Sequence, residues 1–245
     1  MSQIAVKAVL VEERGRSDWQ RLSRLAGVVA FVQLAFVLMT MVVVFTVGAE
    51  PETALAYYTV LSEQRLIGLL RLDFPTVIQM SLFPITVVGI YAALRESRPA
   101  YALLTVVLVV TGIVLGLANH SALSMIRLSD MYAAATSAAD RELLLAAGEA
   151  VIATDIWNGT AGFLAGIFMQ GAFVFISYVM LKTTVFSRWT AYTGMLANGL
   201  DLLHVFVGLV APGVSYVLLA IGGVFYLAWF PLLGRDLWRA GRGNG

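Results

Sequence analysis

Three polar side chains stand at helical spacing inside an otherwise apolar run near the C-terminus. Asn198, Asp201 and His204 are each three residues apart, so neighbours in the series lie on one side of a helix. A carboxyl, an imidazole and an amide so placed suit hydrogen bonding between helices, acid–base chemistry or ligand binding. An ionisable residue inside a membrane helix costs roughly 2.5–3.5 kcal/mol on insertion scales, which makes it a candidate functional residue. In a purely structural interpretation, Asp201 bonds His204 or is protonated, and Asn198 bridges to another helix.

A second group of polar side chains flanks two other apolar runs. His120 follows the third run, and Asp155 and Asn158 open the fourth. If successive runs cross a membrane in alternate directions, these residues fall in the same leaflet half as His204. We therefore predict an outward-facing polar pocket. Its predicted ligand-binding residues are His120, Asp155, Asn158, Asn198, Asp201 and His204.

Metal and hydrolase chemistry have weaker support. Two His and a carboxylate can form a catalytic zinc site, but such sites usually place two ligands at short fixed spacing, as in H-E-x-x-H. His120 and His204 are far apart in the chain, and there is no Cys. No serine stands in G-x-S-x-G, so an elbow-type hydrolase is not indicated. We expect no metal site, no cofactor and no assigned catalytic residue.

The composition places these residues in a membrane protein. Of 245 residues, 60% are hydrophobic and 13% are charged, with a mean hydropathy of +0.85. A soluble domain has roughly 45–50% apolar and 25% charged residues. The formal net charge is only +1, whereas nucleic-acid binding needs an excess of basic residues. The expected partner is the lipid bilayer, with no nucleic acid, and a small amphiphilic molecule is the expected ligand.

Six apolar runs are long enough to cross a bilayer, which takes about 20 helical residues. They predict an all-α protein, an integral membrane bundle of six transmembrane helices. The runs cover residues 25–48, 76–94, 100–118, 156–181, 189–210 and 214–233.

The distribution of Lys and Arg predicts the orientation. With the N-terminus inside, twelve of these residues fall in inner segments and four in outer segments. Because Lys and Arg stay on the cytoplasmic side, both termini are expected in the cytoplasm. The chain then divides into a cytoplasmic segment 1–24, one transmembrane domain 25–234 and a cytoplasmic tail 235–245. Within the first segment we expect a charged loop, followed by a helix that begins at the capping box of Ser17 and Gln20.

The two outer connections, residues 49–75 and 119–155, are much longer than ordinary loops. The first reads as a helical stretch over 61–72, with Asp73 and Pro75 as start signals for the second span. In the second, Ser137 and Asp140 open a helix that runs to Ile152. We expect these segments to form an extracytoplasmic helical cap. The alternative is a lid over a pocket.

The fourth run contains a G-x-x-x-G pattern at Gly162 and Gly166. Small residues at this spacing let helices approach closely. Five other helices of the same chain need partners, which favours packing within the monomer. An oligomer that forms through Gly162 and Gly166 stays open as the alternative.

Three stretches together resemble a known bacterial family. They are SMIRLSDMYAAATSAADRELLLAAGEA at 124–150, VFSRWTAYTGMLANGLDLL at 185–203 and AIGGVFYLAWFPLLGRDLWR at 220–239. The most specific part is the SD-x-YAAAT segment at 129–136. The chain resembles the six-span family catalogued as domain of unknown function 4386. The resemblance implies a multi-pass protein of the bacterial cytoplasmic (inner) membrane, and it implies no assigned activity or catalytic residues.

These observations support a non-enzymatic role as the leading hypothesis: the protein binds or transports a small or amphiphilic molecule through the outward-facing pocket. One alternative is an intramembrane enzyme, metal-assisted or acid–base, that uses Asp201 and His204 as the reacting pair. Another is a structural subunit or assembly factor of a membrane complex, whose polar residues hold helices together.

Overall fold

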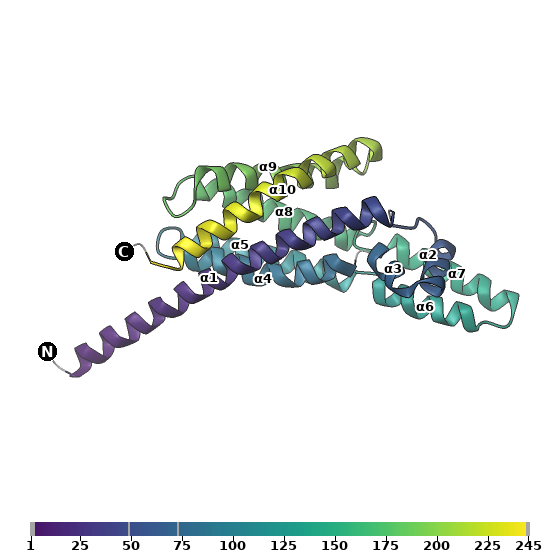
Figure 1. Ribbon diagram of the computed structural model, residues 1–245, viewed down its shortest axis with the longest axis horizontal. Helices are drawn as coiled ribbons and strands as arrows, with labels where there is room; N and C mark the ends of the chain where they lie inside the picture. The colour runs from purple at the N-terminus through teal and green to yellow at the C-terminus, as the bar shows by residue number, and fades with distance from the viewer. Residues whose placement is uncertain (1–2, 49, 73, 244–245) are drawn as a thin grey trace. The chain divides into compact units, whose positions relative to one another are not determined.

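A computed structural model describes residues 3–48, 50–72 and 74–243, with side chains from residue 15 onward. This part of the chain is helical throughout and contains no β-strand (Figure 1). The helices are α1 (Gln3–Thr46), α2 (Ala54–Glu63), α3 (Arg65–Arg71), α4 (Phe74–Leu94), α5 (Pro99–Ala118), α6 (Ala122–Ala134), α7 (Ala138–Ala153), α8 (Thr160–Met180), α9 (Arg188–Val207) and α10 (Pro212–Ala240).

Five helical stretches among the described residues are long and apolar enough to cross a membrane. They lie in Gly15–Thr46, Phe74–Leu94, Pro99–Ala134, Thr160–Met180 and Pro212–Ala240. Helix α9 has a comparable length of 20 residues but does not meet the same criterion, because its apolar run is interrupted by the polar residues described below. The expected all-helical architecture is confirmed, and the sixth span remains a prediction.

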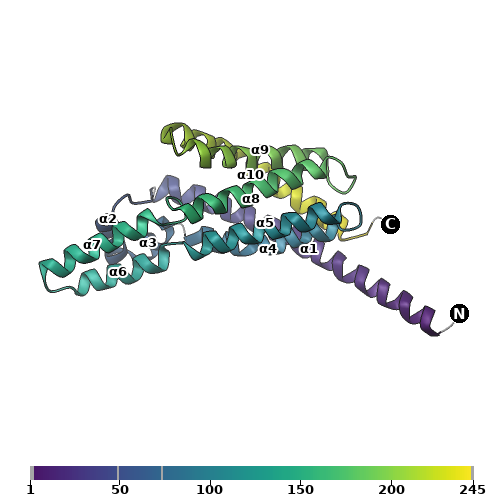
Figure 2. The same cartoon turned by 180° about the vertical axis from the view of Figure 1, so that it is seen from behind.

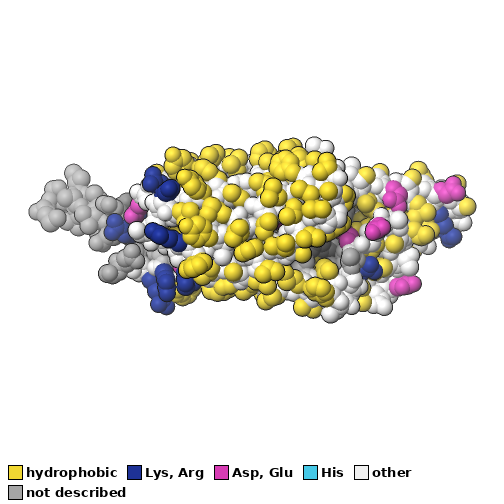
Figure 3. Space-filling view, turned by 90° about the horizontal axis from the view of Figure 1, so that it is seen from above, with side chains coloured by type: hydrophobic (Ala, Val, Ile, Leu, Met, Phe, Trp, Pro, Cys, Tyr) yellow, Lys and Arg dark blue, Asp and Glu magenta, His cyan; other side chains and the backbone are white. Residues whose placement is uncertain are grey.

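The surface exposes many large apolar side chains, as is typical of a protein in contact with lipid. Large apolar side chains such as Phe45, Val114 and Val224 are 86%, 60% and 61% exposed. Hydrophobic side chains cover much of the face drawn in Figure 3. Soluble monomers rarely expose apolar patches of this extent. Polar Gln33 and Thr86, by contrast, are fully buried and joined by a 2.7 Å hydrogen bond from Thr86 Oγ1 to Gln33 Oε1.

The expectation of a charged loop before the first span is wrong. Helix α1 runs without a break through this segment, so the helix does not begin at the capping box of Ser17 and Gln20. Residues such as Glu and Arg are good helix formers, and the single Gly15 weakens a helix by only about 1 kcal/mol. The polarity of the segment was therefore no sign of a loop. Ala49, Asp73, Asn244 and Gly245 lie outside the described residues, and with them the predicted start signal at Asp73.

The chain divides into two compact units. Unit 1 comprises Met1–Leu34, Leu82–Val110 and Gln170–Gly245, and unit 2 comprises Ala35–Ser81 and Thr111–Met169. Within unit 1, α9 and α10 lie side by side and contact each other extensively (Figures 1 and 2). A fully buried aromatic group, which includes Phe173, Trp229 and Phe230, packs where α8 meets this pair.

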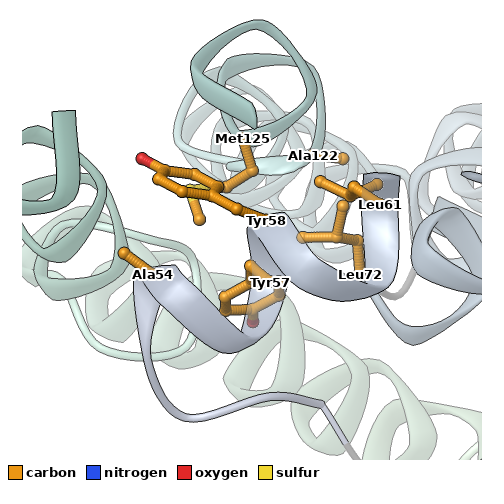
Figure 4. Packing of buried hydrophobic residues seen from close by; sticks show 7 residues of the cluster. All are labelled: Ala54, Tyr57, Tyr58, Leu61, Leu72, Ala122 and Met125. Atoms are coloured by element: carbon orange, nitrogen blue, oxygen red, sulfur yellow. The ribbon is translucent and has the colours of Figure 1, made fainter. Parts of the chain in front are cut away.

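In unit 2, the helices of the two long connections pack on one another. Helix α2 contacts α3, α6 and α7, and α6 contacts α7. Their core is an apolar cluster in which Tyr58 of α2 lies beside Met125 of α6 (Figure 4). The cluster consists of Ala54, Tyr57, Tyr58, Leu61, Leu72, Ala122 and Met125.

The local structure of these connections follows the sequence only in part. Ser137 caps α7 as expected, because its Oγ accepts a 3.0 Å hydrogen bond from the Asp140 amide. The single stretch expected over 61–72 is instead two helices that meet at Gln64, where the backbone leaves the helical conformation at φ −143°. Helix α6 was not predicted at all.

Candidate functional site

The Asp201 cluster consists of Gln170, Asn198, Asp201 and Tyr226, and it joins three helices of unit 1. Asp201 Oδ2 accepts hydrogen bonds from Gln170 Nε2 of α8 at 2.6 Å and from the Tyr226 hydroxyl of α10 at 2.9 Å. Asn198 Oδ1 lies 3.1 Å from the same hydroxyl, and Gln170 Oε1 lies 3.2 Å from it. Asn198 is 1% exposed, whereas Asp201 is half-buried. The carboxyl is thus held by neutral partners from two neighbouring helices.

Helix α9 places these side chains on one face because they recur every three or four residues. Gly194 lies on this face between Thr190 and Asn198, and its missing side chain permits close packing. A Cβ there would lie 2.4 Å from Ser177 Oγ and 2.6 Å from Trp229 Nε1. The sequence therefore brings α9 close to both α8 and α10.

A second polar group fixes the N-terminal end of α9. Asp236 of α10 is 3% exposed, and its Oδ2 accepts hydrogen bonds from the Ser187 amide at 2.8 Å and from Thr190 Oγ1 at 2.5 Å. Arg235 pairs with Asp236 Oδ1 at 2.8 Å and donates to Ser187 Oγ at 3.0 Å. Because the first amides of a helix lack partners within it, this carboxylate acts as a cap supplied by another helix.

His204 does not bond Asp201. Its Nδ1 lies 2.5 Å from Ser215 Oγ of α10, and Ser215 Oγ also donates to the His204 carbonyl at 3.0 Å. The structural interpretation of an Asp201–His204 hydrogen bond is therefore wrong, because the side chains of α9 find their partners on α8 and α10. The bridge from Asn198 to another helix is present, through Tyr226.

The other predicted site residues belong to unit 2. Asp155 is 4% exposed, and its carboxylate accepts hydrogen bonds from the Ser121 amide at 2.9 Å and the Trp157 amide at 3.0 Å. His120 Nδ1 accepts from the Ala122 amide at 3.3 Å. Asn158 donates to the Ile152 carbonyl at 3.1 Å. Asp155 and His120 thus satisfy backbone amides where α6 begins.

Unit 2 also contains an open cavity of about 200 Å³, which we call the α2–α6 cavity. Five of its seven lining residues carry a hydroxyl group, and one carries a guanidinium. The lining residues are Tyr58, Thr59, Ser62, Ser129, Tyr132, Ala133 and Arg141. None of the six predicted ligand-binding residues lines it.

The polar groups of this cavity are partly engaged by the backbone. The Tyr58 hydroxyl donates to the Leu144 carbonyl at 2.8 Å, and Ser129 Oγ donates to the Tyr58 carbonyl at 3.3 Å. Arg141 is exposed, and its Nη2 donates to the Ala135 carbonyl at 3.1 Å. The other N–H groups of Arg141 can therefore point to a ligand, while the hydroxyl oxygens keep lone pairs that accept hydrogen bonds.

Ionisable groups around this core are tuned by burial and by their neighbours. Burial raises the pKa of the Tyr57 phenol well above its usual range, and a hydrogen bond to Glu50 adds to the effect. Burial also raises the pKa of Tyr58, with a smaller contribution from the charge of Glu149. Both phenols therefore stay protonated hydrogen-bond donors at neutral pH.

A bidentate ion pair connects α3 to α6 at the surface. Arg65 Nη1 and Nη2 donate to the two carboxylate oxygens of Asp130 at 2.9 and 3.0 Å. These hydrogen bonds lower the pKa of Asp130. The pair is exposed on both sides, so water and salt screen it.

The sequence reasoning missed Gln170 and Tyr226, although a signal existed. Gln170 is a lone amide in the middle of an apolar run, and Tyr226 lies far from either end of the sixth run. Polar side chains at such depth usually find a partner on another helix. Among the lining residues of the α2–α6 cavity, Ser129, Tyr132 and Ala133 lie in the SD-x-YAAAT segment, but their residue types alone do not indicate a binding site.

Two further observations concern metal binding and the glycine pattern of the fourth run. Among the described residues, no group of three or more His, Cys, Asp or Glu side chains is placed to hold a metal ion. A Cβ on Gly162 would overlap the backbone of Ile156 from the same chain, at 1.8 Å from its carbonyl oxygen. Gly162 thus serves a close contact within unit 2.

Comparison with known proteins adds no relative to this picture: no protein-family model, no curated protein and no solved structure matches the chain.

Proposed function

We propose that this chain is a multi-pass membrane protein that binds or transports a small or amphiphilic molecule, with the α2–α6 cavity as its binding site. The cavity itself is the observation that carries the proposal. At about 200 Å³ it can hold a small polar molecule or the head group of an amphiphile. It lies between helices of the two long connections, which are the segments free to carry function.

The lining of the cavity favours a ligand with a phosphate or carboxylate group. Arg141 is its one charged residue, and a guanidinium binds such groups with two parallel hydrogen bonds. The hydroxyls of Thr59 and Ser62 already donate to backbone carbonyls, so they are left as acceptors for ligand hydroxyl groups. A glycerol phosphate group, free in solution or in a lipid head group, combines both features.

The remaining expectations on topology belong to the same proposal. Six spans, with α9 as the fifth, put the cavity helices outside the cytoplasm and both termini inside. The excess of Lys and Arg in the segments assigned to the inside supports this orientation. The helices α2, α3, α6 and α7 then form the extracytoplasmic cap. A bacterial inner membrane and the family of domain of unknown function 4386 are part of this proposal on the strength of the sequence resemblance.

A thermal-unfolding assay in a neutral detergent tests the binding site. The probes are glycerol 1-phosphate and short-chain phosphatidylglycerol, with glycerol and short-chain phosphatidylcholine as matched controls. We expect a phosphate-bearing glycerol probe to raise the unfolding temperature of the wild type. A response to glycerol 1-phosphate indicates a free phosphate ligand, whereas a response to the lipid alone indicates an amphiphile.

Two arginine variants make the assay specific. Arg141→Ala removes the guanidinium from the cavity and should abolish the response. Arg127→Ala on α6 removes another exposed arginine that does not line the cavity, and it should leave the response intact. No response in the wild type, or an equal response in Arg141→Ala, would remove the cavity from the account.

One observation favours a second candidate, a structural subunit or assembly factor. Asn198, Asp201 and His204 all bond side chains or carbonyls of their own chain, as residues that hold helices together do. Co-purification of one stable partner at native expression would support this role. The enzyme alternative has no comparable support, because Asp201 and His204 bond different partners.

A further inference from the structure

The interface between α9 and α10 contains polar contacts at both ends and between them. His204 meets Ser215 at one end, and Asp201 meets Tyr226 farther along. At the other end of α9, Ser187 and Thr190 meet Asp236. All these groups belong to unit 1.

The hydrogen atoms of the Asp201 cluster are too few for its contacts. Three oxygens lie within 3.2 Å of the Tyr226 hydroxyl, which has one hydrogen: Gln170 Oε1, Asn198 Oδ1 and Asp201 Oδ2. The Asn198 amide is oriented by its 2.8 Å hydrogen bond from Nδ2 to the Gly194 carbonyl, so its oxygen must face Tyr226.

Reversing the other amide does not solve this shortage. If the Gln170 side chain were turned over, its oxygen would face Asp201 Oδ2 at 2.6 Å, and that contact would need a hydrogen as well. In either orientation the cluster has a place for one more hydrogen. The carboxyl of Asp201 is the group in the cluster that can bind it.

Two unpaired polar atoms lie beside Gly194, one helical turn from Asn198 and one from Thr190, which bonds Asp236. In the described part of the chain, neither Ser177 Oγ nor Trp229 Nε1 has a hydrogen-bond partner, and both residues are fully buried. Both atoms pack closely against Gly194, 2.4 and 2.6 Å from where its Cβ would lie, and the carbonyl of Gly194 bonds Asn198. Buried polar atoms without partners usually mark a place for water.

We propose that the Asp201 cluster is a proton-exchange site, and that water reaches it past Ser177 and Trp229 from the end of α9 where Asp236 lies. A hydronium ion gives its proton to the Asp201 carboxylate, so that an O–H bond forms at the carboxyl and a water molecule is released. The reverse step returns the proton to water. The titratable groups that face Asp201 in the described structure are Tyr226 of α10 and His204 on α9 itself. The residues involved do not line the α2–α6 cavity, so this site stands apart from the proposed ligand site.

Infrared spectroscopy of the full chain in phosphatidylcholine liposomes tests this proposal. We expect a carbonyl band of a protonated carboxyl that disappears as the pH is raised and shifts in D₂O. Asp201→Asn should lose the band, whereas Asp130→Asn, which removes an exposed carboxylate, should keep it. If Asp201→Asn fails to fold, Tyr226→Phe serves instead, because the loss of its hydroxyl should shift the frequency of the same band.

The water path has its own test. Ser177→Ala removes the buried hydroxyl with little change in volume and should slow deuterium exchange of the band several-fold. Thr193→Val removes a hydroxyl of α9 that bonds the helix's own carbonyl at Trp189, and it should not change the exchange. A wild type without the band at any pH, or a band that persists in Asp201→Asn, overturns the site. An unchanged exchange rate in Ser177→Ala overturns the path.

Discussion

The hydroxyl of Tyr226 lies 2.9 Å from Oδ2 of Asp201, which joins α10 to the one carboxyl in the middle of α9. Gln170 adds a contact from α8, so three helices meet at this carboxyl. The pairing explains how a helix with a polar centre is held among apolar neighbours. It also places Asn198 and Asp201, two of the three polar residues that the sequence made conspicuous, in one cluster.

Replacing Asp201 should show how much this cluster contributes to stability. Asp201→Leu leaves the Gln170 amide and the Tyr226 hydroxyl without their shared acceptor, and it should lower the free energy of unfolding by about 1–2 kcal/mol relative to Asp201→Asn. Titration of each variant in mild detergent with a denaturing detergent measures the difference between their free energies of unfolding. Leu203→Ala, at an exposed position on the same helix, should change stability by less than about 1 kcal/mol. An Asp201→Leu protein as stable as Asp201→Asn would contradict the predicted stabilisation.

Removing the cap at the other end of α9 should have a larger effect. Asp236→Ala leaves the Ser187 amide and the Thr190 hydroxyl without their buried acceptor, and hydrogen bonds to a charged group are worth about 1.5–3 kcal/mol. We expect a loss of about 2–3 kcal/mol in the same unfolding assay. Arg239→Ala, an exposed residue on the same helix, is the control. If Asp236→Ala had the same free energy of unfolding as Arg239→Ala and the wild type, the cap would make no measurable contribution to stability.

Two glycines of α1 should respond oppositely to alanine. A Cβ on Gly27 would lie 2.8 Å from the Gly234 carbonyl oxygen of α10, so Gly27→Ala should destabilise unit 1 by about 1–3 kcal/mol through overpacking. A Cβ on Gly15 meets no atom within 4 Å, so Gly15→Ala should stabilise the helix by up to about 1 kcal/mol. Thermal unfolding of the two variants provides the comparison. The same sign of change in both would refute the close approach of α1 and α10.

The raised pKa of Tyr58 predicts how unit 2 responds to alkali. Because burial raises this pKa above the usual value of about 10, the folded state holds the phenol proton more tightly than the unfolded chain does. Its contribution to stability is therefore complete below about pH 10 and is lost as the pH rises through the raised pKa. An absorbance titration of tyrosinate should show that Tyr57 and Tyr58 ionise only when these helices unfold. Tyr58→Phe should reduce the number of tyrosines that ionise only on unfolding by one. Ionisation of all nine tyrosines near the usual pKa of about 10 would contradict the raised pKa of Tyr58.

The helices that the sequence predicted best are those that length and apolarity define. The second and third apolar runs end at Leu94 and Ala118, where α4 and α5 end. Crossing a bilayer demands such runs whatever their neighbours are. The charged N-terminal segment was misjudged because polarity alone does not interrupt a helix.

Other features depend on contacts that one sequence does not specify. Helix α6 was missed, although its buried residues Ala122, Met125 and Ser129 recur at helical spacing. Asp201 was recognised as a candidate residue, but its partners Gln170 and Tyr226 depend on how α8, α9 and α10 pack. The α2–α6 cavity arises where α2, α6 and α7 pack together, and the SD-x-YAAAT segment, which supplies Ser129, Tyr132 and Ala133, does not by itself indicate a cavity.

The proposed six-span topology depends most on α9 crossing the membrane, and labelling of single cysteines tests this most directly. The chain has no native Cys, so Thr136→Cys, Val210→Cys and Thr184→Cys each introduce one thiol at an exposed position. With a maleimide that cannot cross the membrane, intact cells should label the variants at 136 and 210, whereas the variant at 184 should react only after lysis. If the cysteines at 184 and 210 reacted from the same side, α9 would not span the membrane, and the six-span account would be wrong.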